Sequence, residues 1–124
     1  MSPTGTHRNL LAWREAMTLA ERVYRDTGAL PREEVFGLRS QIRRAAISIP
    51  SNIAEGAGRS SPPELVRFLS IACGSLAELE TQLELAVRLG YLPASAPSLE
   101  QASRVGMLLR TLRKSRKNAL AISH

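Results

Sequence analysis

The sequence predicts an all-α protein that folds as an antiparallel up-down four-helix bundle. Leu, Ala, Arg and Glu dominate its 124 residues, 4% are aromatic, and the alternating Val, Ile and Thr runs that mark strands are missing. Four segments carry apolar residues at helical spacing, and their short connections place each helix beside the preceding one. A chain of this length supports one core, so a single domain over residues 1–124 is expected, with residues 1–8 polar and mobile.

The first helix is expected from about Leu10 to Thr27, because apolar residues recur there at a helical period. Gly28 and Pro31 follow it, and both residue types commonly end helices. The residues expected to face the core are Trp13, Ala16, Met17, Ala20, Val23, Tyr24 and Thr27.

The second helix is expected from about Glu33 to Gly56, with Pro50 inside it. Proline removes a backbone donor and normally bends or ends a helix. The apolar spacing continues on both sides of the proline, at Leu38, Ile42, Ala45, Ile49 and Ile53. This pattern favours one helix kinked near Pro50, and a short new helix capped by Asn52 and Glu55 is the alternative.

The third helix has the clearest start in the chain. Ser61 is placed as its N-cap, a proline follows at the first helical position, and Glu64 stands where a capping box needs its acid. Gly90 is placed to end this helix in the left-handed conformation. Ser98 and Gln101 form a weaker capping box for the fourth helix. Residues expected in the core include Trp13, Ile42, Ile49, Leu69, Leu76 and Leu109.

Groups suited to catalysis or metal binding are scarce. His7 and His124 lie near the two ends, away from a rigid scaffold, and Cys73 is the single cysteine, expected as a small buried residue, with a reactive thiol as the alternative. The acids of the third helix lack the Glu-x-x-His pattern of bundle metal sites and are expected on a solvated face. They are Glu78, Glu80 and Glu84. We therefore expect no enzyme activity, no catalytic residues, no metal and no cofactor.

The location of the protein is indicated by three features of the sequence. The first residues lack the apolar stretch of a signal peptide, no window approaches a membrane span, and a lone cysteine suits a reducing compartment. We expect a cytoplasmic protein without a membrane partner.

A stripe of basic residues is expected on the fourth helix. The formal net charge is +6, which favours anionic partners such as nucleic acid. The stripe lies on an arc opposite Val105 and Leu109 and consists of Arg110, Arg113, Lys114 and Lys117. No acid follows Glu100, so the stripe is a binding surface unless it is merely solvated or neutralised by acids of the third helix. Arg116 falls inside the apolar arc, so it either pairs with a carboxylate or marks where the arc leaves the core.

Polar residues line one flank of the second helix, on neighbouring turns. They are Gln41, Arg44, Ser48, Asn52 and Glu55. Ile47 is expected on the side opposite the core, where it adds apolar surface beyond what one bundle needs. The flank is therefore either a binding site or the edge of an interface with a second protomer.

Several stretches match a known family. They are Trp13 with Ala16, Phe36-Gly37-Leu38, Gln41 to Arg44, Ser48 to Gly56, and Ala72 to Leu79 as "ACGSLAEL". Over nearly its whole length the chain resembles the 23S rRNA-intervening sequence proteins. The resemblance implies a bacterial four-helix bundle without established enzymatic activity, assembled as a ring, a homopentamer. The matching signature positions, none with an assigned chemical role, are Gln41, Arg43, Arg44, Ser48, Asn52, Glu55 and Gly56.

The expected function follows partly by analogy. A similar bundle, the accessory protein of diversity-generating retroelements, forms a basic pentameric barrel that binds nucleic acid and its reverse transcriptase. We expect a non-catalytic oligomeric protein that binds RNA or DNA through a basic surface. The alternative is a structural adaptor that recruits a protein partner and does not bind nucleic acid.

Overall fold

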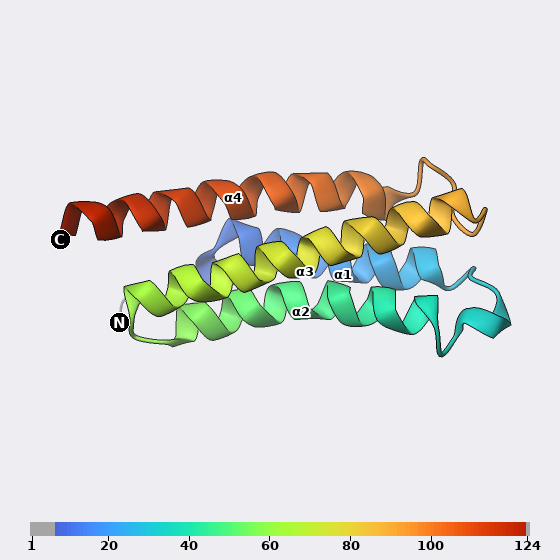
Figure 1. Ribbon diagram of the computed structural model, residues 1–124, viewed down its shortest axis with the longest axis horizontal. Helices are drawn as coiled ribbons and strands as arrows, with labels where there is room; N and C mark the ends of the chain where they lie inside the picture. The colour runs from blue at the N-terminus through green and yellow to red at the C-terminus, as the bar shows by residue number, and fades with distance from the viewer. Residues whose placement is uncertain (1–6, 124) are drawn as a thin grey trace.

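The computed structural model describes residues 7–123, and over this range it confirms the all-α prediction, with four α-helices and no strand (Figure 1). The elements in chain order are the short 3-10 helix η1 (His7–Asn9), α1 (Leu11–Thr27), the 3-10 helix η2 (Arg32–Glu34), α2 (Leu38–Gly58), α3 (Pro62–Arg88) and α4 (Pro97–Ser123). The expected mobile segment, residues 1–8, falls mostly outside the described residues, as does His124.

The four helices form one bundle around a common core. In Figure 1 the chain passes back and forth along the long axis, so that each helix returns beside the preceding one. Contacts join α1 to α2, α2 to α3 and α3 to α4, and α4 closes the bundle against α1. Five of the six residues named for the core are buried, and the sixth, Trp13, is partly buried against it. The five are Ile42, Ile49, Leu69, Leu76 and Leu109.

The predicted inner face of α1 was partly wrong. Met17 and Tyr24 are exposed, whereas Leu19 is completely buried. The residues that α1 buries are Ala12, Ala16, Leu19, Val23 and Thr27. The helix carries two adjacent apolar stripes at the same period, and periodicity alone does not say which stripe faces the partners. Packing against α2 and α4 selects one stripe and leaves the other on the surface.

The predicted start of α2 was also wrong. The segment around Glu33 forms η2, and α2 begins at Leu38. The Glu34 carboxylate still serves the helix, because its Oε1 accepts a hydrogen bond of 3.1 Å from the backbone N–H of Leu38. One of the donors left unpaired at a helix start is thereby satisfied. The hydroxyl of Tyr91 donates to the other oxygen of Glu34, 3.3 Å away, and links this cap to the segment that follows α3.

A single helix runs through Pro50, which is buried. Asn52 does not cap a new helix, since its Nδ2 donates to the Ser48 carbonyl at 2.7 Å, one turn earlier in the same helix. The Ser48 hydroxyl likewise donates to the Ala45 carbonyl at 3.1 Å. Both polar side chains therefore bond to the backbone of their own helix.

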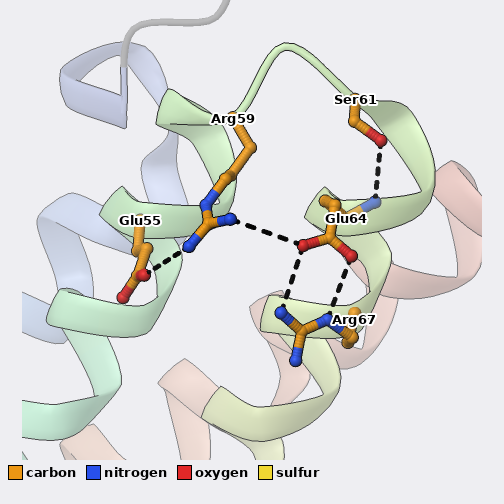
Figure 2. A network of polar contacts seen from close by, with 5 residues as sticks. All are labelled: Glu55, Arg59, Ser61, Glu64 and Arg67. Carbon is orange, nitrogen blue, oxygen red and sulfur yellow. Dashed lines mark hydrogen bonds and ion pairs between the residues drawn. The ribbon is translucent and has the colours of Figure 1, made fainter.

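The turn from α2 to α3 is closed by a polar network (Figure 2). Ser61 caps α3 as predicted, because its hydroxyl accepts the Glu64 backbone N–H at 3.4 Å. The Glu64 carboxylate is held by Arg67 at 3.0 and 3.1 Å and lies 3.8 Å from Arg59, so it does not complete the predicted capping box. Arg59 also binds Glu55 at 2.9 Å. In this way the network connects the end of α2 to the first turn of α3.

The α2 and α3 helices pack tightly against each other at Gly56. A Cβ atom built on Gly56 would lie 2.7 Å from the Cβ of Phe68, a separation that a real side chain cannot adopt. Phe68 is itself buried, and the guanidinium groups of Arg59 and Arg67 lie 5.1 and 4.6 Å from its ring centre. Glycine at position 56 therefore sets the distance between α2 and α3 at this end of the bundle.

At the other end of the bundle, α3 ends as predicted and α4 begins differently. Gly90 has a φ of 80°, and the N–H of Tyr91 donates to the Ala86 carbonyl, as in the common glycine cap. The predicted capping box of α4 was wrong, because the Ser98 backbone N–H donates to the Asp26 carboxylate at 2.9 Å. The cap of α4 is thus supplied by the end of α1.

Gln101 joins α4 to α1 instead of capping its own helix. Its Nε2 donates to the Glu15 carbonyl and carboxylate at 2.9 and 3.0 Å, and its Oε1 accepts from Arg22 at 3.0 Å. Arg104 adds an ion pair of 2.7 Å to the same carboxylate. The hydrogen bond from Gln101, followed by that from Arg104, lowers the pKa of Glu15 below its ordinary value of 4.5.

We predict that Gly56→Ala lowers the free energy of unfolding by about 1 to 3 kcal/mol, because the added methyl group overpacks the contact with Phe68. Gly74→Ala is the matched control. Gly74 is an exposed glycine within α3 with open space around it, so alanine there should stabilise by about 1 kcal/mol. Urea unfolding monitored by circular dichroism measures both, and equal stability of the Gly56→Ala variant and the parent would contradict the close approach.

We predict that Glu15→Gln destabilises the protein at pH 7 by about 1 kcal/mol, because it removes the charge that Arg104 and Gln101 bind. A carboxyl with a lowered folded-state pKa stabilises above its unfolded pKa, and this stabilisation disappears as the pH falls through the folded value. The difference from the parent should therefore shrink below pH 4.5. Glu84→Gln is the control, since Glu84 pairs only with exposed Arg88. A difference that persisted unchanged in acid would reject the interpretation.

Candidate functional site

The predicted basic stripe lies on the second half of α4. It begins directly after Leu109, the last residue that α4 buries completely. Arg110, Lys114 and Lys117 are exposed, and Arg113 is half-buried. Among residues 7–123, none of the four has an ion pair within 4.0 Å. The stripe therefore lies at the surface with its charge uncompensated by a direct partner.

The expected position of the stripe opposite the core needs correction. The guanidinium of Arg110 folds back along α4, and its Nη1 is 2.9 Å from the Cβ position of Gly106, which is buried against Leu76 of α3. The stripe thus borders the α3 side of the helix. Arg113 is half-buried because its position around the helix axis lies close to the apolar arc of α4.

Glu80 and Glu84 of α3 lie too far along the bundle to neutralise Lys114 and Lys117. Leu76 and Gly106 are neighbours across the α3–α4 contact, and the two helices run in opposite directions (Figure 1). Lys114 is eight residues beyond Gly106, whereas Glu80 is four residues from Leu76 toward the other end. At 1.5 Å per residue these charges are separated by about 18 Å along the axis. Glu84 is farther still and pairs with Arg88 at 2.7 Å.

The relative lengths of α1 and α4 leave the end of α4 without a neighbour on one side. The α1 helix has 17 residues and α4 has 27. Glu15, near the start of α1, already binds Gln101 and Arg104 in the first third of α4. Arg116 is exposed, so it marks the place where the apolar arc leaves the core, one of its two predicted roles.

The polar flank of α2 lies beside α3. Gln41, Arg44, Ala45 and Ser48 line a surface groove of about 460 Å³ with Glu78 of α3. Arg44 forms no ion pair among the residues that the structure describes. Three of the five flank residues, Gln41, Arg44 and Ser48, therefore share one groove with Glu78. The other two, Asn52 and Glu55, do not line this groove.

Two other signature residues stabilise their own surroundings. Glu55 is bound by Arg59, as Figure 2 shows. Arg43 lies on the α1 side of α2, where its Nε donates to the Thr27 hydroxyl and its Nη2 to the Tyr24 carbonyl, both at 2.9 Å. The Arg43 guanidinium also lies 4.4 Å from the centre of the Tyr24 ring. These contacts connect the end of α1 to α2.

Arg43 also lines a surface groove that combines apolar residues with two further arginines. The groove there has a volume of about 420 Å³ and is lined by Tyr24, Val35, Phe36, Arg39, Ser40, Arg43, Arg44 and Ile47. Phe36 is 96% exposed and Ile47 is 45% exposed, the latter as predicted. The exposure of Phe36 and Tyr24 was missed, because an aromatic residue is ordinarily assigned to the core. The only sequence signal was the second apolar stripe of α1.

Within residues 7–123 no three His, Cys, Asp or Glu side chains are grouped so that they could hold a metal ion. Cys73 is half-buried and packs against the core. None of the helices described combines the length and the apolar character that crossing a membrane requires.

No curated protein matches the chain. A family model described as 23S rRNA-intervening sequence protein matches residues 8–111, which include all of α1, α2 and α3 and more than half of α4. A match over this much of the chain is sufficient to assign it. The protein belongs to the 23S rRNA-intervening sequence protein family.

Proposed function

We propose that this protein is a non-catalytic, oligomeric helical bundle that binds nucleic acid, RNA or DNA, through the basic end of α4. The observation that carries the proposal is a group of five cations without ion pairs in the described structure. They are Arg110, Arg113, Lys114, Arg116 and Lys117. No acid of the chain follows Glu100. The family description, which refers to 23S rRNA, is compatible with an association with RNA.

The physical basis of the proposal is phosphate neutralisation. Each cation that approaches a phosphate releases condensed counterions, so affinity comes from the number of contacts and falls with salt. One stripe of this size binds weakly, and an oligomer that repeats the stripe in each protomer multiplies the contacts. An assembly therefore strengthens nucleic-acid binding, and the proposed binding is in turn a reason to propose an assembly.

We propose a closed homo-oligomer, a pentamer on the strength of the family resemblance, in a bacterial cytoplasm. The exposed apolar residues on the α1–α2 side are the proposed contact with a neighbouring copy, namely Met17, Tyr24, Phe36 and Ile47. Monomeric proteins rarely leave so many large apolar side chains together at the surface. A bend in α2 at Pro50 would let this helix follow its own bundle on one side and the neighbouring protomer on the other.

The second candidate function is a protein adaptor. The groove that Phe36 lines favours it, because a nearly completely exposed phenylalanine that shares this groove with Arg39 and Ile47 is suited to a protein partner. Under this alternative the basic end of α4 is a solvated surface, and the protein does not bind nucleic acid.

We predict that Lys114→Glu/Lys117→Glu abolishes binding to RNA and DNA while the bundle stays folded, because both side chains are exposed and lie outside the core. Arg25→Glu/Arg32→Glu, which makes the same change in net charge at exposed positions of α1 and η2, should retain most of the affinity. Fluorescence anisotropy across a salt series measures this, and for duplex DNA the logarithmic slope should be about 0.9 per phosphate contacted.

Two outcomes would change the conclusion. If the parent binds no single- or double-stranded RNA or DNA at low salt, the nucleic-acid function is rejected and the adaptor remains. If the glutamate variant loses its oligomeric state, the cations belong to a contact between protomers.

We predict that Ile47→Glu converts the oligomer into monomers, because a carboxylate in an apolar contact is left desolvated and unpaired. Leu89→Glu is the control, since Leu89 is 51% exposed, similar to Ile47, but lies at the end of the bundle beside Gly90. Light scattering at tens of micromolar protein distinguishes the two variants. A monomeric parent would reject the assembly, and an intact Ile47→Glu oligomer would reject this surface as the contact.

A further inference from the structure

The groove that Phe36 lines carries positive charge that its own surroundings do not neutralise. It is called here the arginine groove, and its lining residues include three arginines and no acid. Among residues 7–123, neither Arg39 nor Arg44 has an ion pair within 4.0 Å. Arg43 donates only to uncharged groups of α1, a hydroxyl and a carbonyl. The groove therefore presents cations to an anionic partner.

The same groove also has apolar surface. Val35, Phe36 and Ile47 line it, and Phe36 is almost completely exposed. A phosphate backbone would pair with the arginines and leave these apolar side chains in water. A partner that fills the groove therefore needs acidic and apolar side chains next to one another.

The outer side of α3 has this combination. Six side chains between residues 77 and 85 are exposed and lie within about 160° of the helix circumference, opposite the buried Leu79 and Leu83. No other stretch of seven residues in the chain contains three acids, as residues 78–84 do. This surface is called here the acidic face of α3, and it consists of Ala77, Glu78, Glu80, Thr81, Glu84 and Leu85.

Most of the negative charge on this face is not neutralised within the chain. Over residues 7–123, Glu78 and Glu80 have no ion pair within 4.0 Å. Glu84 pairs with Arg88, and both side chains of this pair are largely exposed. Because an exposed pair contributes little stability, an arginine from a partner can compete for Glu84.

We propose that the arginine groove of one copy of this protein binds the acidic face of α3 of the next copy. The inference rests on the proposed assembly and identifies the second surface of its contact. The exposed Leu85 offers apolar surface to Phe36 and Ile47. The acids around Leu85 offer carboxylates to Arg39 and Arg44, which lack ion pairs in the described part of their own chain.

This pairing is heterologous, because the groove and the acidic face are different surfaces of the chain. The groove lies between α1 and α2, whereas the acidic face belongs to the outer side of α3. A head-to-tail contact repeats from copy to copy and closes into a ring when the rotation between copies allows it. Two grooves placed against each other would instead bring arginines together, and the repulsion between like charges opposes that arrangement.

The test reverses the charge of each surface separately. The groove variant is Arg39→Glu/Arg44→Glu, and the α3 variant is Glu80→Arg/Glu84→Arg. Glu78 is left unchanged because it lines a second groove with Arg44 of its own chain. Sedimentation velocity measures assembly of the full-length proteins, and circular dichroism checks that they are folded. Each variant should raise the dissociation constant of the assembly at least about ten-fold.

A combined variant that carries all four substitutions gives the sharpest result. Every contact in its assembly again joins opposite charges, with the two signs exchanged. Its dissociation constant should therefore return to within about three-fold of that of the parent. If the groove variant does not fold, Arg44→Glu alone replaces it in both proteins, since Arg44 is exposed.

Two control variants make the same changes in net charge at exposed positions outside both surfaces. They are Arg25→Glu/Arg32→Glu and Glu33→Arg/Glu100→Arg, and both should assemble like the parent. If either the groove variant or the α3 variant assembles like the parent, the inference is overturned and the proposed assembly stands. A combined variant that assembles no more tightly than the two separate ones overturns it as well. A monomeric parent would instead reject the proposed assembly itself.

Discussion

The close contact between α2 and α3 at Gly56 is the constraint on which the rest of the structure depends. The missing side chain lets the backbone of α2 approach Phe68, and the Ser61 cap with the Glu55–Arg59–Glu64 network closes the turn at that distance. A short connection and a fixed distance leave little freedom in how the two helices slide past one another. Gln41, Arg44 and Ser48 of α2 consequently line a groove together with Glu78 of α3.

The same register determines which surfaces remain for partners. Once α2 buries Ile42, Ile49 and Ile53, its opposite side carries Ile47 outward. The second apolar stripe of α1 is then left on the surface beside it, with Tyr24 held in place by Arg43. The groove with apolar residues and arginines therefore lies on one side of α2. The polar groove lies on the other side of α2, toward Glu78 of α3. One helix thus contributes to both surfaces.

The basic end of α4 results from a mismatch in length between α1 and α4. Asp26 and Glu15 of α1 bind the first turns of α4, and the two helices run in opposite directions. Because α1 is the shorter helix, its first residue lies beside a position of α4 that is still about ten residues from the end of α4. Without α1 beside it, this part of the helix gains little by carrying apolar residues. Cations are tolerated there because water solvates them on nearly every side. The position of the charge at one end of the bundle is therefore a property of the packing as much as of the composition.

Local sequence patterns by themselves determined the parts of this protein that depend on residues within a turn or two. The Ser61 cap and the Gly90 helix end follow from such neighbours, and periodicity was sufficient for Ile42, Ile49 and Leu69 in the core. Only the tertiary structure decided which apolar stripe of α1 faces inward, because both stripes have the same period. It also decided that Asp26 caps α4, since that contact joins residues 72 positions apart. Exposure of Phe36 and separation of Lys114 from Glu80 likewise depend on register and helix length, which arise only when the four helices pack together.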